Sequence, residues 1–227
     1  MPKPRLLYYD IWNYTPANQS LLHENFEVVS LPDPDHDTSE VLASVDALLA
    51  PLGWFCGAEK IERCPRLKVI GSNTTGDPHI DVVYARSKGL SVVTLKPYEE
   101  FLDSITPTAE MTVGLMVALS RNLVPAIRSV TGEARWERWP FGGERMLSRM
   151  SLGIIGLGRL GRKVAAYASS MGMVVRYFDP YVSSHDTHFL KVGSLAELVA
   201  ESDIVSLHMP HEAETENLIN GAVFAKC

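Results

Sequence analysis

Short apolar runs alternate along the chain with longer stretches in which apolar residues recur at helical spacing. This alternation is typical of βα units arranged around a mostly parallel sheet. In the first half we expect strands at 5–9, 26–31, 47–50, 67–71 and 91–94, with helices at 18–24, 39–44, 57–63 and 81–88. Five such repeats predict a small, doubly wound α/β domain.

The segment 107–130 differs because its apolar residues keep helical spacing for more than twenty positions. We expect one long helix here, which Thr106 or Thr108 caps and which carries the chain out of the first domain. The stretch 135–143 follows and is rich in aromatic residues and glycine, including Trp136 and Trp139. These tryptophans predict either ordinary core packing or a subunit interface, where such side chains are enriched.

The second half predicts strands at 152–155, 173–178 and 203–207 and helices at 160–171 and 195–200, the latter capped by Ser194. A short helix is expected between Thr215 and residue 224. A complete doubly wound dinucleotide domain has about six strands. Three strands therefore predict only the first half of such a sheet. The expected domains of the chain are residues 1–105 and 106–227.

A glycine-rich loop, Gly-Leu-Gly-Arg-Leu-Gly, joins the strand at 152–155 to the helix at 160–171. Gly156 permits a tight turn, Gly158 lets the backbone approach a pyrophosphate, and Gly161 lets the helix pack closely on the strand. The N–H groups around Arg159 and Leu160 lie at a helix N-terminus, which favours phosphate. The alternative is a tight turn without a ligand, but the strand and helix around the loop favour a dinucleotide site.

An acidic residue, Asp179, follows Gly156 by 23 positions and ends the next predicted strand. That distance is close to the roughly 20 residues expected for the carboxylate that binds the adenosine ribose. Such a carboxylate accepts hydrogen bonds from ribose hydroxyls and repels a 2′-phosphate. Pro180 and Tyr181 supply no cation, and the direction of Arg176 is open. The sequence therefore predicts NAD rather than NADP as the cofactor.

His208, Met209 and Pro210 follow the last predicted strand, at the sheet edge where open α/β sheets bind ligands. We expect them to line the adenosine side of the cofactor pocket, with Thr215 able to reach the same pocket. The alternative for His208 is a structural role.

Charge and composition narrow the function classes. Lys and Arg number 21 against 27 Asp and Glu, and no basic stripe stands out, which argues against nucleic acid as a partner. The sequence shows no signal peptide, transmembrane run or metal-ligand motif, so we expect a cytoplasmic protein without a metal or membrane partner. Cys56, Cys64 and Cys227 form no paired framework and are expected to be incidental thiols.

Five blocks of sequence, at 71–81, 108–112, 152–161, 179–181 and 205–219, occur together in one order. In these blocks the chain resembles the NAD-dependent, D-isomer-specific 2-hydroxyacid dehydrogenases. The resemblance implies a flavodoxin-like substrate domain followed by a Rossmann NAD-binding domain. It also implies a homodimer and a small 2-hydroxy or 2-keto acid as substrate.

The resemblance gives Asn73, Thr74, Thr75 and Gly76 the role of gripping the substrate carboxylate through backbone N–H groups. Loops that aim several amides at one point bind anions in this way. The alternative is a plain βα loop, because Gly and Thr are common in turns. Asp77 and Asp81 are expected to cap the next helix rather than take part in chemistry.

Glu110 and Thr112 resemble a family stretch near the nicotinamide phosphate, although Met111 stands where the family usually has histidine. The family's catalytic arginine, glutamate and histidine are expected beyond Cys227, so no catalytic residue is assigned here. The remaining histidines, which match no family position, are expected at the surface: His79, His185, His188 and His211.

Three functions compete on this evidence. The first is an oxidoreductase that converts a D-2-hydroxy acid to a 2-keto acid with NAD, in which the chain as given is inactive or impaired. The second is a non-enzymatic NAD-binding regulator, because relatives of the family act as corepressors. The third, a methyltransferase-type Rossmann protein, is disfavoured by the upstream substrate-like domain and the block at 208–210.

Overall fold

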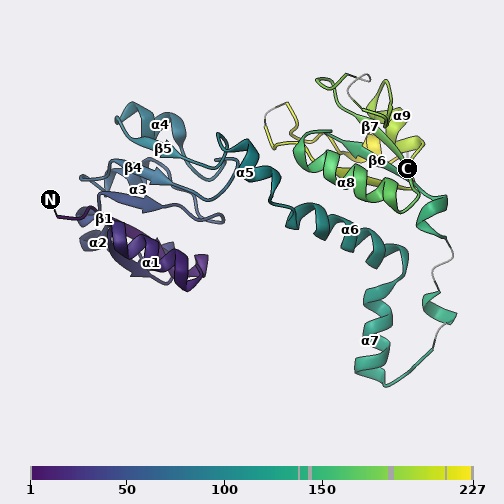
Figure 1. The fold of residues 1–227 in the computed structure, drawn as a ribbon, viewed down its shortest axis with the longest axis horizontal. Coiled ribbons are helices and arrows are strands. Elements are labelled where there is room, and N and C mark those ends of the chain that lie inside the picture. The colour runs from purple at the N-terminus through teal and green to yellow at the C-terminus, as the bar shows by residue number, and fades with distance from the viewer. Residues whose placement is uncertain (1, 138, 143–144, 184–186, 213, 226–227) are drawn as a thin grey trace. The chain divides into compact units, whose positions relative to one another are not determined.

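The computed structural model describes residues 2–137, 139–142, 145–183, 187–212 and 214–225. The chain divides into two units, residues 1–102 and residues 103–227. Both are α/β folds with parallel sheets, as the sequence predicts, and Figure 1 labels their elements. Arg138 and Gly143 of the aromatic stretch, His185 and Cys227 lie outside the described residues.

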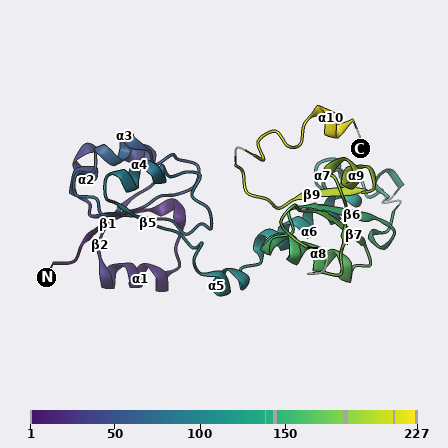
Figure 2. The same ribbon diagram turned by 90° about the horizontal axis from the view of Figure 1, so that it is seen from above.

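The first unit holds a five-stranded parallel sheet in the order β2-β1-β3-β4-β5, which is the flavodoxin-like order. Its strands are β1 (Arg5–Tyr9), β2 (Glu27–Leu31), β3 (Ala47–Leu49), β4 (Val69–Gly71) and β5 (Ser91–Val93). Its helices are α1 (Pro16–Asn25), α2 (Ser39–Ser44), α3 (Ala58–Glu62) and α4 (Val82–Ser87), and α5 (Glu99–Asp103) follows. Figure 2 shows α1 on one face of the sheet and α2, α3 and α4 on the other.

The second unit holds a four-stranded parallel sheet in the order β8-β7-β6-β9. Its strands are β6 (Ser151–Ile155), β7 (Val174–Phe178), β8 (Leu190–Lys191) and β9 (Ile204–Leu207). Numbered from β6, this is the order 3-2-1-4 of a Rossmann sheet, so the first half and one strand of the second half are present. The prediction of three strands is wrong by one, because β8 has two exposed residues and no alternating pattern.

The helices of the second unit are α6 (Pro107–Ser120), α7 (Leu123–Glu133), α8 (Arg159–Ser170), α9 (Leu195–Ala200) and α10 (Gly221–Phe224). α6 and α8 cover one face of the sheet and α9 the other (Figure 2). Ser194 caps α9 as predicted, accepting the N–H of Glu197 at 3.1 Å. The helix predicted between Thr215 and residue 224 is shorter than expected, because Asn220 caps it only at Gly221.

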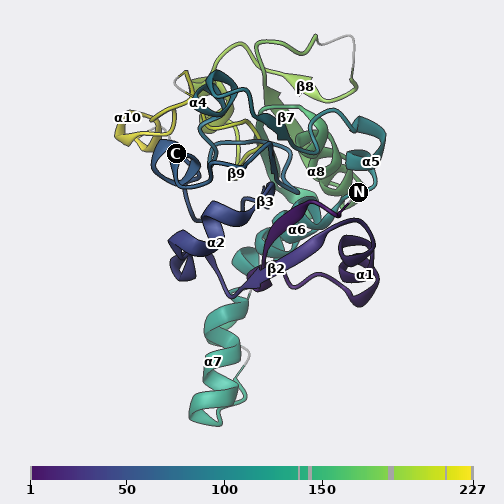
Figure 3. The same ribbon diagram turned by 90° about the vertical axis from the view of Figure 1, so that its left-hand side faces the viewer.

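The predicted single helix over 107–130 is wrong, because the structure has two helices that meet at Asn122. Asn122 adopts a left-handed conformation with φ 48°, which asparagine tolerates better than most residues. Pro125 explains the break: in a continuous helix its ring would clash with the Arg121 carbonyl. In α7 it falls in the first turn, where no N–H is needed. Figures 1 and 3 show α7 projecting from the α/β core of its unit.

Buried apolar side chains form a separate core in each unit. The core of the first unit gathers around Leu7, Tyr9, Leu48 and Ile70, and includes the free cysteines Cys56 and Cys64. In the second unit, residues from β6, β7, α8 and α6 pack together, and a smaller cluster lies under α9. Among the described residues no single helix is long and apolar enough to span a membrane; the bent pair Glu99–Ser120 and Leu123–Glu133 passes that test only when taken together.

Candidate cofactor and substrate sites

The glycine loop connects β6 to α8, so the predicted strand–turn–helix order is confirmed. Gly156 has φ +87°, a conformation that favours glycine, and a Cβ there would lie 3.0 Å from the carbonyl of His208. A Cβ on Gly161 would lie 2.2 Å from the Gly156 carbonyl oxygen. The turn and the close approach of α8 therefore both require glycine.

Gly158 differs from its neighbours because a Cβ there would meet nothing within 4 Å. Its φ of −73° is open to any residue, so neither strain nor packing in the protein itself requires glycine. In the described part of the chain, the N–H groups of Gly158 and Leu160 donate to no acceptor. The first turn of α8 thus presents open space and unpaired amides, which suits a phosphate group.

Arg159 starts α8 and is half-buried, and its guanidinium donates to the carbonyl of Ile105 at 3.1 Å. The side chain therefore ties the N-terminus of α8 to the segment that precedes α6. Thr112, on α6, donates its hydroxyl to the Thr108 carbonyl at 2.8 Å. Glu110 accepts a hydrogen bond from the hydroxyl of Thr106, which starts the helix without capping it through its side chain.

Asp179 ends β7 and is 7% exposed. Its Oδ2 accepts the N–H of Leu157 in the glycine loop at 2.7 Å, and its Oδ1 accepts the N–H groups of Tyr181 and Val182 at 2.8 and 3.2 Å. A carboxylate has about four acceptor positions, so about one remains for a ribose hydroxyl. The sequence did not indicate this second role, in which Asp179 holds the glycine loop and the turn at Pro180.

Arg176 lies on β7 and pairs with Glu201 at 2.8 Å. Its charge is therefore neutralised within the protein rather than held ready for a ligand phosphate.

The block after β9 lies against the glycine loop, because the His208 N–H donates to the Ile155 carbonyl at 2.8 Å. The His208 Nε2 is 2.9 Å from the hydroxyl of Ser206, and burial lowers the pKa of the imidazole. Met209 packs in the cluster under α9, with Pro210 following. Thr215 closes the next loop, with its hydroxyl 2.8 Å from the Pro210 carbonyl.

In the first unit, the predicted carboxylate loop follows β4. Asn73, Thr75 and Gly76 are exposed, and Thr74 is half-buried. Within the described residues, the N–H groups of all four donate to no acceptor. Four consecutive amides without partners fit an anion site better than an ordinary turn, in which hydrogen bonds usually close the loop.

Two buried residues lie beside this loop, and the sequence indicated a role for neither. Ser72 is buried, with its hydroxyl 2.9 Å from that of Thr74. His79 is 6% exposed, so its expected surface position is wrong: a bridge between Cys56 and Ile80 holds this segment against the first unit, with the His79 Nε2 3.1 Å from the Ala50 carbonyl. His188 and His211 are exposed as predicted, and Asp81 caps α4 as predicted, accepting the Tyr84 N–H at 2.9 Å. Asp77 contributes no side-chain cap to that helix.

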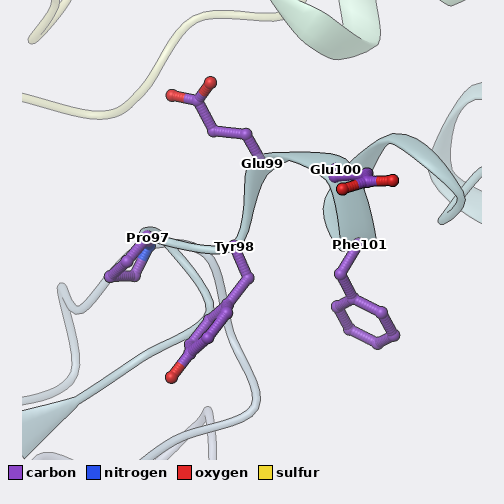
Figure 4. Close-up of a pocket in the computed structure, with 5 residues that line it drawn as sticks. All are labelled: Pro97, Tyr98, Glu99, Glu100 and Phe101. Carbon is purple, nitrogen blue, oxygen red and sulfur yellow. The ribbon is translucent and has the colours of Figure 1, made fainter.

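A hollow of about 720 Å³ in the described part of the chain does not coincide with these loops. It lies along Pro97–Phe101, just before and within α5. Figure 4 shows Tyr98 and Phe101 pointing to one side of this segment and Glu99 to the other. An open, largely one-segment surface of this kind lacks the converging polar groups of a binding site. Nor do the described residues include a group of three or more His, Cys, Asp or Glu side chains arranged to hold a metal ion.

Comparison with known families agrees with this geometry. Residues 6–156 match the D-isomer specific 2-hydroxyacid dehydrogenase catalytic domain. Residues 113–227 match the NAD binding domain of the same family. The chain therefore belongs to the D-isomer specific 2-hydroxyacid dehydrogenase family, and its second unit is an NAD-binding domain with NAD as the cofactor.

The chain is similar to curated relatives over most of its own length. It is 32% identical to D-3-phosphoglycerate dehydrogenase of Mycobacterium bovis, over 93% of this chain and 39% of the relative. It is also 32% identical to hydroxypyruvate reductase of Thermotoga maritima, over 92% of this chain and 66% of the relative. The chain thus spans about two fifths of the length of the first relative and about two thirds of the second.

Solved structures give the same assignment of fold. One neighbour is D-lactate dehydrogenase from Aquifex aeolicus, complexed with NAD and lactic acid, with a TM-score of 0.78 and 26% identity over 98% of this chain and 65% of that one. Another is a putative D-isomer specific 2-hydroxyacid dehydrogenase from Polaromonas, with a TM-score of 0.81 and 25% identity over 100% of this chain and 71% of that one.

Proposed function

We propose that the protein is an NAD-dependent oxidoreductase that acts on the CH–OH group of a D-2-hydroxy acid and forms the 2-keto acid. The observation that carries this proposal is the pairing of two anion-binding features in one chain of this family. One is the loop of unpaired amides at residues 73–76, and the other is the N-terminus of α8. The solved neighbour that contains both NAD and lactic acid supports the same chemistry.

We assign substrate binding to residues 1–105. In this assignment the amides of Asn73, Thr74, Thr75 and Gly76 hold the substrate carboxylate. Several N–H donors aimed at one carboxylate form charge-assisted hydrogen bonds, which are stronger than neutral ones and fix orientation. Such a grip orients the carbon that carries the hydroxyl group, and orientation is a large part of catalysis.

We assign cofactor binding to residues 106–227. The amides of Gly158, Arg159 and Leu160 receive the pyrophosphate, while Gly156 and Gly161 shape the turn. Asp179 receives a ribose hydroxyl, with Pro180 beside it. The remaining lining is assigned to Thr112, His208, Met209, Pro210 and Thr215. The open space at Gly158 and the spare acceptor position on Asp179 fit a dinucleotide. Bound NAD supplies the hydride acceptor of the reaction.

We propose a preference for NAD over NADP. A 2′-phosphate would meet the Asp179 carboxylate, and the cation of Arg176 is already paired with Glu201. The 2′-phosphate and the Asp179 carboxylate are both negative and would repel each other, which disfavours the binding of NADP. A titration with NADH and NADPH, followed by quenching of tryptophan fluorescence, tests this preference. Equal affinities would show that the ribose site is misplaced.

We assign no catalytic residue within residues 1–227. The family's catalytic Arg, Glu and His have no counterparts at matching positions of this sequence. Loss of general acid–base catalysis costs roughly 10²–10⁴-fold in rate. We therefore propose that the 227-residue polypeptide, assayed by itself, binds NADH and turns over 2-keto acids slowly or not at all.

A non-enzymatic NAD-binding regulator is the second candidate, because the amides at the start of α8 and the Asp179 carboxylate would hold a dinucleotide without any catalytic residue. NADH oxidation with glyoxylate, pyruvate and hydroxypyruvate separates the two. Any turnover that is specific for the D-isomer in the reverse direction supports the dehydrogenase. Tight NADH binding without turnover is expected of this polypeptide under both candidates, so turnover is the result that decides between them.

We also propose a homodimer. Apolar side chains on α7 and the following stretch face solvent, including Ile127 at 51% exposure, Trp136 at 89% and Trp139 at 88%. Exposed aromatic and aliphatic clusters of this kind mark interfaces. Light scattering should give twice the chain mass, and Ile127→Asp should give the monomer. A monomeric parent chain would contradict the proposal.

A further inference from the structure

His79 lies buried beneath the loop that we assign to the substrate carboxylate. Its Nε2 is 3.1 Å from the hydroxyl oxygen of Ser72 and 3.1 Å from the carbonyl oxygen of Ala50. Its Nδ1 is buried and, in the described part of the protein, has no hydrogen-bond partner. One ring nitrogen of this buried histidine therefore has hydrogen-bond partners while the other has none among the described residues, and such a group needs an explanation.

The positions of the hydrogens follow from the acceptors. The Thr74 hydroxyl is 2.6 Å from the Gly76 carbonyl, which can only accept, so Thr74 donates there. The 2.9 Å contact between the Ser72 and Thr74 hydroxyls then fits donation by Ser72, whose hydroxyl also lies 3.1 Å from the Ala50 carbonyl and has one hydrogen for these two acceptors. The Ala50 carbonyl can only accept, and the His79 Nε2 lies 3.1 Å from it, so Nε2 carries the hydrogen of the neutral imidazole. The same N–H lies 3.1 Å from the Ser72 oxygen, which can accept from it.

These contacts link His79 through Ser72 and Thr74 to the carbonyl of Gly76, and the Ala50 carbonyl is a second acceptor for both His79 and Ser72. Hydrogen bonds in such a chain polarise one another. Burial lowers the pKa of His79, which agrees with a neutral ring at the start of the chain.

Two hydrogen bonds orient amides of the loop, and the first of them ends the series of contacts that starts at His79. In a trans peptide the C=O and the following N–H point in opposite directions. The Gly76 carbonyl is turned toward Thr74, so the N–H of Asp77 points away from it. The Thr74 carbonyl accepts from the N–H of Leu95 at 2.9 Å, so the N–H of Thr75 also points away. Neither amide has an acceptor within the described residues.

We propose that His79 is a positioning residue of the substrate site, which acts through Ser72 and Thr74 to aim the amide of Asp77, beside that of Thr75, at the substrate carboxylate. This inference rests on the proposed function, in which the loop binds that carboxylate. It adds Asp77 to the donors and gives the buried histidine a role that helix capping or core packing alone does not supply.

The test uses the full chain, labelled with ¹⁵N, and oxalate as the carboxylate probe. Oxalate should shift the amide signals of Thr75 and Asp77. His79→Leu should bind oxalate about tenfold more weakly, the loss expected for one hydrogen bond of ordinary strength. His79→Gln, which keeps a donor near the Nε2 position, should restore most of the affinity. NADH affinity should be unchanged in both variants, and His23→Leu, at an exposed histidine, is the matched control.

Two further measurements keep the inference open to refutation if His79→Leu does not fold. Ser72→Ala removes the middle link with little change in volume and should give the same loss. The ¹⁵N shifts of the His79 ring should show hydrogen on Nε2. Hydrogen on Nδ1, or wild-type oxalate affinity in folded His79→Leu or Ser72→Ala, would overturn the inference alone. If oxalate leaves the loop of the parent chain unmoved, the proposed substrate site is wrong and the inference with it.

Discussion

The substitution Gly158→Ala should separate cofactor binding from folding. The new Cβ meets no atom within 4 Å, and φ at this position is −73°, so the folded chain accepts it without strain. Two small effects on stability oppose each other. Alanine restricts the unfolded chain, which stabilises by about 0.4–1 kcal/mol. Alanine is also a poorer N-cap than glycine, by several tenths of a kcal/mol or more. The net change in the free energy of unfolding should lie within about 1 kcal/mol of zero.

Binding of NADH should respond very differently. The methyl group would occupy the open space through which the backbone meets the pyrophosphate. A displaced phosphate loses at least one hydrogen bond to a charged group, which is worth about 1.5–3 kcal/mol. NADH affinity should therefore fall by a factor between about 10 and 150.

Two other glycine substitutions serve as comparisons, one for an effect on stability and one for the absence of an effect on NADH affinity. Gly161→Ala forces a Cβ to within 2.2 Å of the Gly156 carbonyl oxygen, and overpacking of this kind costs about 1–3 kcal/mol or more. A gain in helix propensity of about 1 kcal/mol offsets part of that cost. Gly132→Ala lies on α7 with nothing within 4 Å of its Cβ, and should leave NADH affinity unchanged. Urea unfolding and a fluorescence titration with NADH measure the two quantities. Wild-type NADH affinity in Gly158→Ala would refute the placement of the pyrophosphate.

The other predictions concern three buried polar groups. Asp179→Ala should weaken NADH binding and relax the preference for NADH over NADPH. It should also lower the free energy of unfolding, measured in urea, by at least about 2 kcal/mol, because the backbone N–H groups that donate to Asp179 lose their acceptor. Unchanged stability would contradict those contacts. Lys60→Met should lower stability by less than the roughly 3–5 kcal/mol of a fully unpaired buried charge, since Asp37 loses its ion pair at 2.7 Å but keeps the hydrogen bond from the Tyr9 hydroxyl, and it should leave NADH affinity intact. Burial depresses the pKa of His79 in the folded chain, so its contribution to stability is full above about pH 6.5 and is lost as the pH falls through the lower folded value. His79→Gln should flatten that part of the pH profile, and an NMR titration with a His79 midpoint at or above about 6.5, the ordinary value for histidine, would contradict the burial.

Much of the fold could be predicted from the chain's pattern of apolar residues. The strands of the first unit and the helices α2 and α9 fall where alternating apolar runs and Ser or Thr caps place them. β8 escaped prediction because two exposed residues carry no periodicity, and their strand pairing depends on β7 beside them. Short elements of this kind are fixed by tertiary contacts rather than by local sequence.

The break between α6 and α7 was predictable in principle. Pro125 forbids a continuous helix through Arg121, and Asn122 is a residue that tolerates the left-handed conformation. The apolar periodicity on both sides of Pro125 predicts one continuous helix, whereas the proline predicts a break. The structure follows the proline, so a proline within a periodic segment is the better predictor of where a helix ends.

The candidate sites show where local sequence reasoning ends. The glycine loop could be recognised from the sequence, because three glycines at this spacing between an apolar strand and a helix form a known pattern. The second role of Asp179 and the buried position of His79 could not, because both depend on contacts between residues distant in the chain or on how a loop folds over itself. Carboxylates at strand ends and histidines after prolines have many other roles in proteins, so local sequence does not identify these two.

The assignments in the second unit depend on NAD binding at the N-terminus of α8. A titration of the ¹⁵N-labelled 227-residue chain with NADH tests this placement. We expect saturable binding, with the largest amide shifts at Gly158 and Leu160 and weaker binding of NADPH. Absence of saturable binding, or shifts that leave both of these amides unmoved, would contradict the placement.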